Sequence, residues 1–295
     1  MYKGFIVFFC ILLNLLFVNK SFASDIIVIS GSESDVDQYT QNRGVYLGSE
    51  TNRIIFEDLK QRFTFVHKYI PLVRQAERLA LSVPTCVTHR IETIERLKEY
   101  YFTFPINLYE THRLYQKSSD AELTETLLDE YGNVKSLVAL FQKLPTQRLI
   151  LIKNANYGSV LQNQIDRLDP ARLMLVNGGD LEGRNLLLVE RGRAEFVLAL
   201  PQLVKTRYLN PLNKDKLRSY KLADMPEYAP GHIMCNKSAY NEGVVDAINS
   251  SIVKLFQNGS FEKVYAKYLP NDEAARISKE MGFLLESKIQ GNLAL

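Results

Sequence analysis

Arg96 is the side chain in this sequence best suited to hold a small anion. Its planar guanidinium can donate two parallel hydrogen bonds to one carboxylate, a geometry that lysine does not reproduce. It ends the segment TIER at residues 93–96, and the segment FTFP follows at residues 102–105. The alternative is an exposed helix arginine that pairs with Glu92 or Glu99, and the residue type by itself does not choose between the two.

A second candidate is the loop of residues 154–159 (NANYGS), which contains Asn156, Tyr157, Gly158 and Ser159. It follows the apolar run RLILIK at 148–153, which is typical of a buried strand, and it opens a predicted helix over 159–168. The first N–H groups of a helix lack partners and suit an anion. Ordinary strand-to-helix turn chemistry would give the same pattern.

Metal binding and enzyme chemistry find little support in the residue pattern. The four histidines lack ligand spacing such as H-x-x-x-H, and the two cysteines outside the N-terminal segment are too few for a tetrahedral zinc site. No metal or other cofactor is therefore expected. Glu33, Glu190 and Glu195 could act as a general acid or base, but none stands in a recognisable catalytic pattern. We expect a protein that is not an enzyme.

Residues 1–23 have the layout of a secretory signal peptide. Lys3 gives a short positive start, an apolar run covers 5–18, and the small residues Ser21 and Ala23 stand at the −3 and −1 positions of a cleavage site. The apolar run is about 14 residues long, shorter than the ~20 that a transmembrane helix needs, which favours cleavage over an uncleaved anchor. Cys10 has no small residue before it, which argues against a lipid anchor. We expect a periplasmic protein.

Export would leave Cys86 and Cys235 as the cysteines of the mature chain. Two thiols in an oxidising compartment often pair, whereas two separate buried thiols would behave as small hydrophobic side chains. Their spacing alone leaves both possibilities open.

The composition is that of an ordinary globular protein. The chain has 295 residues, of which 46% are hydrophobic and 23% are charged, and this excludes wholesale disorder and low complexity. Without residues 1–23 it carries 34 basic and 33 acidic residues, a formal charge of +1. This balance gives no field for nucleic acid or anionic lipid. The length predicts about two folding units.

Short apolar runs alternate with amphipathic ones along most of the chain, which predicts an α/β fold with mainly parallel sheets. The polar stretch 31–48 predicts a loop. Strands are predicted at 25–30, 63–69, 85–88, 148–153, 172–176, 194–200 and 232–236, with a crossing segment at 108–115. Helices are predicted at 49–63, 71–81, 92–100, 120–131, 134–143, 159–168, 180–191, 240–257 and 261–268, and in a last segment that ends near 287.

Three stretches together resemble the bacterial extracellular solute-binding proteins of the amino-acid-binding type, which have the type II periplasmic-binding fold. The segments TIER and FTFP are similar to that family's T-x-E-R motif and the F-S-x-P-like segment after it. Residues 192–198 (GRAEFVL) resemble its G-R-x-D strand. Residues 232–269 contain HIMCNKS, a helix, an Asn-Gly turn and a Tyr-rich helix, like the family's closing pattern. The order and spacing of these motifs carry the resemblance.

The resemblance implies two α/β lobes joined by two crossing hinge strands, each lobe a mixed, mainly parallel sheet flanked by helices. Lobe one would comprise residues 24–109 and 229–295, and lobe two, inserted between them, residues 110–228. Proteins of this fold close around a ligand by hinge motion. The strands that carry Cys86 and Cys235 would be neighbours in lobe one, which favours a disulfide worth roughly 2–5 kcal/mol.

The resemblance also implies ligand roles. The arginine that matches Arg96 binds the ligand carboxylate, and the loop that matches 154–159 holds the same group from lobe two. Arg90 could add a second positive charge and favour a more acidic ligand, or it could be a surface residue at a strand end. Acidic residues of the first loop could receive a cationic group or be solvated: Glu33, Asp35 and Asp37.

The chain departs from the family pattern in three places, of which one is the first-strand loop at 31–35, which lacks the usual aromatic pair. Members that bind ordinary amino acids usually carry an acid near the position of Leu200, where it holds the ammonium group, whereas residues 198–201 contain no acid. The segment before TIER is usually rich in Gly and Thr, whereas here it is HRI at 89–91. These changes weaken the amino-acid reading. Aromatic residues expected near the cleft could stack on a ligand or be core: Phe65, Tyr69, Tyr109 and Tyr157.

The function expected from these features is a monomeric periplasmic solute-binding protein. It would capture a small carboxylate-bearing or zwitterionic solute for a membrane transporter or a membrane-bound sensor. One alternative is a binding fold with an altered cleft that acts as a protein-interaction or sensor partner. The other is a dehydratase-like enzyme of the same fold.

Overall fold

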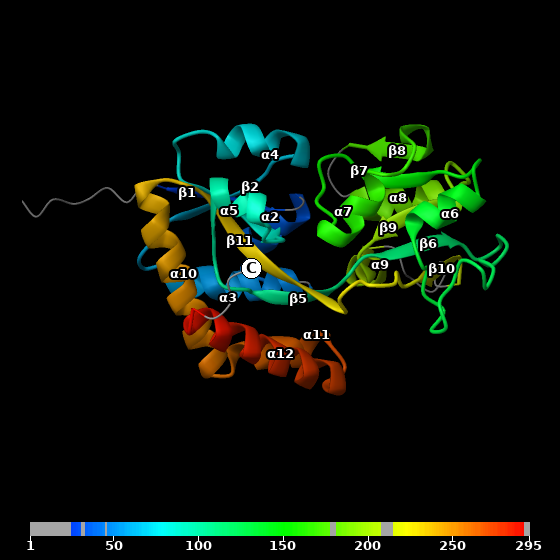
Figure 1. Cartoon of the computed structure of the whole chain (residues 1–295). Helices are drawn as coiled ribbons and strands as arrows, with labels where there is room; N and C mark the ends of the chain where they lie inside the picture. The colour runs from blue at the N-terminus through cyan, green and yellow to red at the C-terminus, as the bar shows by residue number, and fades with distance from the viewer. Residues whose placement is uncertain (1–24, 31–32, 45, 178–180, 208–214, 292–295) are drawn as a thin grey trace, which may run out of the picture.

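The computed structural model describes residues 25–30, 33–44, 46–177, 181–207 and 215–291. The predicted signal peptide lies outside these ranges. The strands form two separate sheets, one of six strands and one of five. Figure 1 shows the two lobes built on these sheets side by side.

The sheet of lobe one has the strand order β2-β1-β3-β11-β4, and β5 also pairs with β11. β1 is parallel to β2 and β3, while β11 runs antiparallel to β3, β4 and β5. Every residue of β1 is buried between its two neighbours, as its apolar, β-branched sequence predicts. The strands are β1 (Ile26–Ser30), β2 (Phe65–Tyr69), β3 (Thr85–Arg90), β4 (Tyr100–Phe102), β5 (Asn107–Glu110) and β11 (Tyr228–Asn236).

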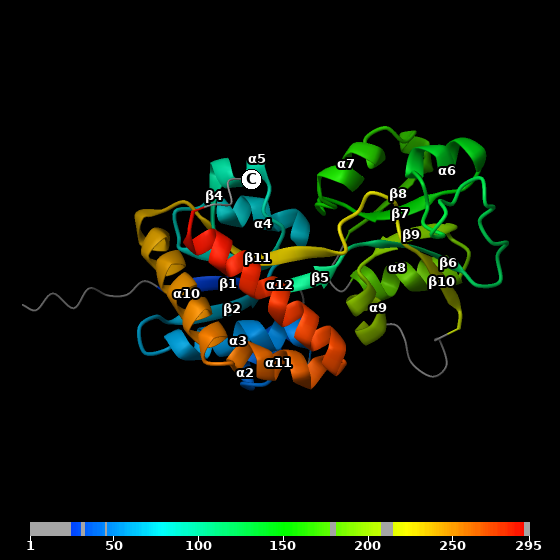
Figure 2. The same cartoon turned by 60° about the horizontal axis from the view of Figure 1, so that its bottom comes forward.

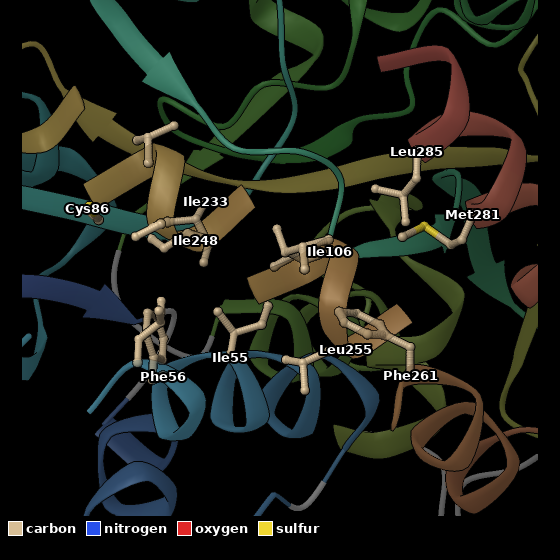
Figure 3. Packing of buried hydrophobic residues seen from close by; sticks show 14 of the residues in the cluster. Ile55, Phe56, Cys86, Ile106, Ile233, Ile248, Leu255, Phe261, Met281 and Leu285 are labelled. Atoms are coloured by element: carbon tan, nitrogen blue, oxygen red, sulfur yellow. The ribbon is translucent and has the colours of Figure 1, made fainter. Parts of the chain in front are cut away.

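Helices cover both faces of this sheet. Figures 1 and 2 show α3, α10, α11 and α12 on one side of it and α4 on the other. Figure 3 shows the larger core, where Ile55 of α3, Ile248 of α10 and Met281 of α12 are fully buried. Each such side chain contributes about 1.5–3 kcal/mol by leaving water. The helices are α2 (Glu33–Thr40), α3 (Leu47–Leu59), α4 (Leu72–Leu79), α5 (Ile94–Glu99), α10 (Ala239–Gln257), α11 (Ser260–Tyr268) and α12 (Asn271–Ile289).

The sheet of lobe two has the order β10-β6-β9-β7-β8. β9, β7 and β8 are parallel, β6 is antiparallel to β9, and β10 is antiparallel to β6. The predicted two-lobed α/β fold with mixed, mainly parallel sheets is therefore confirmed. Among the described strands, only β11 in lobe one and β6 in lobe two run opposite to the other strands of their sheets. The elements of lobe two are β6 (Arg113–Lys117), α6 (Leu137–Lys143), β7 (Leu149–Ile152), α7 (Ser159–Ile165), β8 (Leu173–Val176), α8 (Leu181–Glu190), β9 (Phe196–Ala199), α9 (Pro201–Arg207) and β10 (Leu217–Tyr220).

Two segments of the chain cross between the lobes. The first joins β5 to β6 through Thr111 and His112, and the second joins β10 to β11 through residues 221–227. They are bonded to each other, because the Thr111 N–H donates to the carbonyl of Glu227 at 3.2 Å and the Thr111 Oγ1 donates to that of Pro226 at 2.7 Å. The lobe boundaries at 109–110 and 228–229 stay a prediction.

The structure confirms the predicted disulfide. Cys86 of β3 and Cys235 of β11 stand directly opposite each other in the antiparallel pair, with an S–S distance of 2.04 Å. Both are buried in the core of lobe one. The bridge therefore ties the strand that returns from lobe two to the sheet of lobe one.

Two predictions of local structure are wrong. Residues 31–48 contain α2 and the start of α3. The sequence hides α2 because its buried residues, Asp35 and Gln38, are themselves polar. Residues 120–131 form turns and not a helix. Leu123 and Leu127 pack into the core of lobe two there, and the Asp129 carboxylate holds a local turn by accepting backbone N–H groups.

Candidate functional site

The candidate site lies at the carboxyl ends of the parallel strands, the edge at which open α/β sheets bind ligands. In lobe one, β1, β2 and β3 end at Ser30, Tyr69 and Arg90, and in lobe two β7 ends at Ile152. Figures 1 and 2 both show α4 of lobe one opposite α7 of lobe two. Arg90 and the loop 154–159 therefore stand at corresponding edges of the two lobes.

Arg96 lies in α5, just beyond this edge. The helix begins after Thr93, whose Oγ1 accepts the Arg96 N–H at 3.3 Å. The guanidinium is half-buried, its Nη1 donates to the Ile91 carbonyl at 3.0 Å, and burial lowers its pKa. Glu92 pairs instead with Lys288 at 2.8 Å. Among the residues that the structure describes, no carboxylate lies within ion-pair distance of Arg96.

Arg90 is the last residue of β3 and reaches α4. Its Nη2 donates to the Oε1 of Gln75, and the Gln75 Nε2 donates to the Ile70 carbonyl at 2.8 Å. Burial lowers the pKa of Arg90 to about 10, and the nearby charge of Arg96 adds to the shift. The two arginines are neighbours, because Arg96 donates to the carbonyl of Ile91, the residue after Arg90. In the described ranges no carboxylate pairs with Arg90 either.

A local irregularity directs the side chains at the end of β3. His89 has a φ of +58°, in the left-handed region that residues other than glycine rarely adopt. The pairing of β3 with β11 also shifts register between His232 and Met234. Such a shift re-aims the following side chains. His89 consequently contacts Asn52 of α3, at 2.9 Å between His89 Nε2 and Asn52 Nδ2, while Arg90 turns to α4.

A buried hydrogen-bond network continues from His89 into the hinge strand β5. The Tyr109 hydroxyl lies 2.6 Å from the His89 Nδ1 and accepts the Asn107 Nδ2–H at 3.1 Å. Asn107 also donates to Thr51 of α3. Glycine is required at 231, because a Cβ there would lie 2.4 Å from the Tyr109 ring. Sequence reasoning placed Tyr109 near the cleft but missed His89 and Asn107, whose side chains meet only through the fold.

In lobe two, the loop 154–159 presents mainly backbone and small polar groups. Tyr157 is buried, and its hydroxyl accepts the Ile152 N–H at 2.8 Å, so its ring belongs to the core of the lobe. The Asn156 Oδ1 accepts the Gly158 N–H at 2.8 Å. Gly158 has φ +81° and ψ 159°, a region that is essentially restricted to glycine. Ser159 is exposed and begins α7.

The acidic residues of the first loop are not brought to the arginines. Glu33 is exposed at the start of α2, and Asp37 is exposed further along it. Asp35 is buried and accepts a hydrogen bond from the Tyr46 hydroxyl at 2.7 Å, so its carboxylate stabilises the structure of lobe one. Ser30 at the end of β1 is also buried, and its Oγ has no hydrogen-bond partner among the described residues.

A hollow of about 530 Å³ lies elsewhere in lobe two, between the loop after β6 and the ends of α6 and α8. Its lining includes Gln116, Lys117, Lys143 and Glu195, and it contains none of the predicted ligand-binding residues. In the described part of the chain, no group of three His, Cys, Asp or Glu side chains is placed to hold a metal ion. None of the described helices has the length and apolar character needed to cross a membrane.

These two lobes, their crossing segments and the opposed strand ends define the class of type II periplasmic binding folds. Three solved structures have this fold at TM-scores of 0.58 to 0.60. A protein of Listeria monocytogenes assigned as an L-cystine ABC transporter is 16% identical, over 85% of this chain and 98% of its own. An ancestral arginine-binding protein bound to arginine is 14% identical, over 84% and 99%.

The third is a histidine kinase sensor domain with similarity to periplasmic binding proteins, 13% identical over 84% of this chain and 96% of its own. No protein-family profile matches the sequence. No curated protein matches it either. The likenesses establish the fold that the motifs TIER, FTFP and GRAEFVL indicated.

Proposed function

We propose that this protein is a periplasmic solute-binding protein, exported through a cleaved signal peptide and monomeric. It captures a small carboxylate-bearing or zwitterionic solute between its lobes by hinge closure. It then delivers the solute to a membrane transporter or reports it to a membrane-bound sensor. It catalyses no reaction and carries no cofactor.

The observation that carries this proposal is the state of Arg96. Its guanidinium is half-buried at the ligand-binding edge of lobe one, and its ordinary partners among the glutamates of the described chain are not engaged with it. Burying a charge without a partner costs free energy. A carboxylate would remove this cost by accepting two N–H groups of the fork. We therefore assign Arg96 to the solute carboxylate and Arg90 to the same site.

Lobe two would contribute further hydrogen-bond donors to the solute carboxylate. Asn156 and Ser159 lie where β7 ends and α7 begins, and their backbone N–H groups could donate to the same carboxylate. The Gly158 N–H is held by the Asn156 Oδ1, so Gly158 would contribute through the backbone conformation that shapes the loop. Tyr157 would not contact the solute but would hold the loop in place, because its hydroxyl accepts the Ile152 N–H. Glu33, exposed at the start of α2, could at most contact a cationic group of the solute. Because the crossing segments are short, rotation about them would bring the two edges together.

The solved structures support this function by their printed descriptions. They are an L-cystine ABC transporter protein, an arginine-binding protein and a sensor domain, so transport and sensing both occur on this fold. The Cys86–Cys235 disulfide supports export, because such bridges persist in oxidising compartments.

The test is a thermal-shift screen of the mature protein with amino acids, dicarboxylates, polyamines and small sugars. A solute at 100 times its dissociation constant stabilises the folded state by ~2.7 kcal/mol, or about 5–10 °C in melting temperature. We expect a hit that Arg96→Ala abolishes and that Lys98→Ala, an exposed residue of the same helix, preserves. Silence across the panel would refute the proposal, and turnover of a compound without stabilisation would indicate an enzyme.

One observation favours a second function, a binding fold with an altered cleft that serves a protein or sensor partner. The segment before TIER, which is usually rich in Gly and Thr in this family, is here HRI at 89–91, and the His89 side chain is bonded inside lobe one to Asn52 and Tyr109. Under this function, no compound of the panel raises the melting temperature of the wild-type protein. The same compounds leave the melting temperature of Arg96→Ala unchanged.

A further inference from the structure

Two positive charges lie together at the carboxyl edge of lobe one, and the described chain supplies no anion to either. Arg90 and Arg96 are both half-buried, and their bonded partners, the Gln75 amide and the Ile91 carbonyl, are neutral. Burial lowers the pKa of both groups, and the charge of Arg96 lowers that of Arg90 further. The folded state therefore carries the cost of desolvating both guanidinium groups and the repulsion between their like charges.

Of the four acidic groups considered near this pair, two are bonded to other residues and two are exposed. Glu92 is bonded to Lys288 at 2.8 Å. Asp35 accepts a tyrosine hydroxyl inside lobe one. Glu95 and Glu99 are exposed on α5. None of the carboxylates that the structure describes is therefore paired with either guanidinium group, and a solute could supply this anion.

The two guanidinium groups are anchored separately. Gln75 holds Arg90 from α4, and the Gln75 amide is itself oriented by the Ile70 carbonyl. Arg96 is held from the loop before α5. The left-handed conformation of His89 gives Arg90 its direction toward α4. Two separately anchored guanidinium groups suit two carboxylates, because each guanidinium can donate two parallel hydrogen bonds to one planar carboxylate.

Among the described residues of the site, no acid is placed to hold an ammonium group. The described residues at the end of β9, where an acid would hold it, are Leu198 to Pro201, and the lobe-two loop 154–159 contains no acid. We infer that the solute is a small dicarboxylate without an ammonium group, with one carboxylate on Arg96 and the other on Arg90. This inference rests on the proposed function and narrows its substrate class.

The experiment measures dissociation constants by calorimetry at constant ionic strength for two matched pairs of compounds. Succinate and butyrate share a four-carbon chain and differ by one carboxylate. Glutarate and L-glutamate differ by one ammonium group. We expect succinate to bind at least about tenfold tighter than butyrate, because a hydrogen bond between charged groups contributes enough free energy for such a factor. We also expect glutarate to bind tighter than L-glutamate.

Variants then assign the second carboxylate. Arg90→Gln should weaken succinate at least about tenfold while butyrate changes less than about twofold. Arg90→Lys, which keeps the charge but not the fork, should fall between. Arg74→Gln removes an exposed charge from the same region of α4 and should change neither compound. Circular dichroism of each variant verifies folding.

The outcomes separate this inference from the proposed function. If butyrate or L-glutamate binds as tightly as its dicarboxylate partner, the inference is overturned and solute binding stands. If succinate binds tightly but Arg90→Gln and Arg90→Lys leave it unchanged, the role of Arg90 is overturned. If inorganic phosphate binds and neither dicarboxylate does, the dicarboxylate assignment is wrong. If nothing in the screen or in these pairs binds, the proposed function fails together with the inference.

Discussion

Removing the Cys86–Cys235 disulfide should destabilise lobe one by about 4–5 kcal/mol. The bridge closes a loop with a sequence separation of 149 residues, for which the loop-entropy relation gives about 5 kcal/mol. That loop contains the whole of lobe two, whose first and last strands, β6 and β10, are paired with each other. If lobe two stays folded while lobe one unfolds, the free part of the loop is only about 40 residues and the figure falls to about 4 kcal/mol.

Urea unfolding followed by far-ultraviolet circular dichroism measures this difference, because the chain has no tryptophan. Cys86→Ala/Cys235→Ala is compared with the oxidised protein, and the reduced protein separates the crosslink from the packing of the two buried sulfur atoms. Reductant should shift the unfolding of the wild-type protein and leave the double variant unchanged. The reasoning fails if the oxidised and reduced proteins unfold within about 1 kcal/mol of each other.

Three further outcomes are expected. Gly158→Ala should lower the free energy of unfolding by about 1–3 kcal/mol and weaken solute binding, because the backbone conformation at this position suits only glycine. Gly132→Ala, at a φ of +78° in another loop of lobe two, should lower stability without affecting binding. Unfolding and calorimetry measure the two effects. Burial lowers the pKa of His67 to about 4, below its value of about 6.5 in the unfolded chain, so the unfolded state binds the extra proton and stability should fall as the pH drops from 6.5 toward 4. Unfolding at pH 7, 6 and 5 tests this, and His67→Leu should flatten the slope; an equal slope in both proteins contradicts it. Gly48→Ala should destabilise by about 1–3 kcal/mol, because its Cβ would lie 2.7 Å from the His89 ring, whereas Gly243→Ala on the exposed face of α10 meets no atom and should be neutral or stabilising. Equal melting temperatures for the two variants would show that the neighbours of Gly48 can accommodate a methyl group.

The fold was largely predictable because its central strands carry strong local signals. The run RLILIK became β7 and AEFVLAL contained β9, since continuous apolar sequence fits strands buried on both faces. The disulfide followed from the order of strands that the motif resemblance implied. Elements with weak apolar patterns were not foreseen: β4, α9 and β10.

The misses share one physical cause, which is that tertiary partners decided the local structure. Leu123 and Leu127 have the spacing of a helix face, yet they fill a gap in lobe two from a series of turns. α2 buries polar residues, so its sequence has no apolar stripe to reveal it. At the site, Arg96 and Arg90 could be nominated from their residue type and motif. The role of Gln75 could not, because it depends on a contact across 15 residues that only the packing of α4 against β3 creates.

The long strand β11 makes lobe one a single rigid block up to the crossing point. Its first half is hydrogen-bonded to β5, and its second half is bonded to β3 and β4 and fastened by Cys235. On the other side, Ala223 is already hydrogen-bonded to Val134 of lobe two. Between these anchored parts lie Thr111 and His112 on one crossing segment and residues 224–227 on the other. Because Thr111 is hydrogen-bonded to Pro226 and Glu227, the two segments should bend together, and mutations in them should shift the balance between open and closed forms and with it the apparent affinity for the solute.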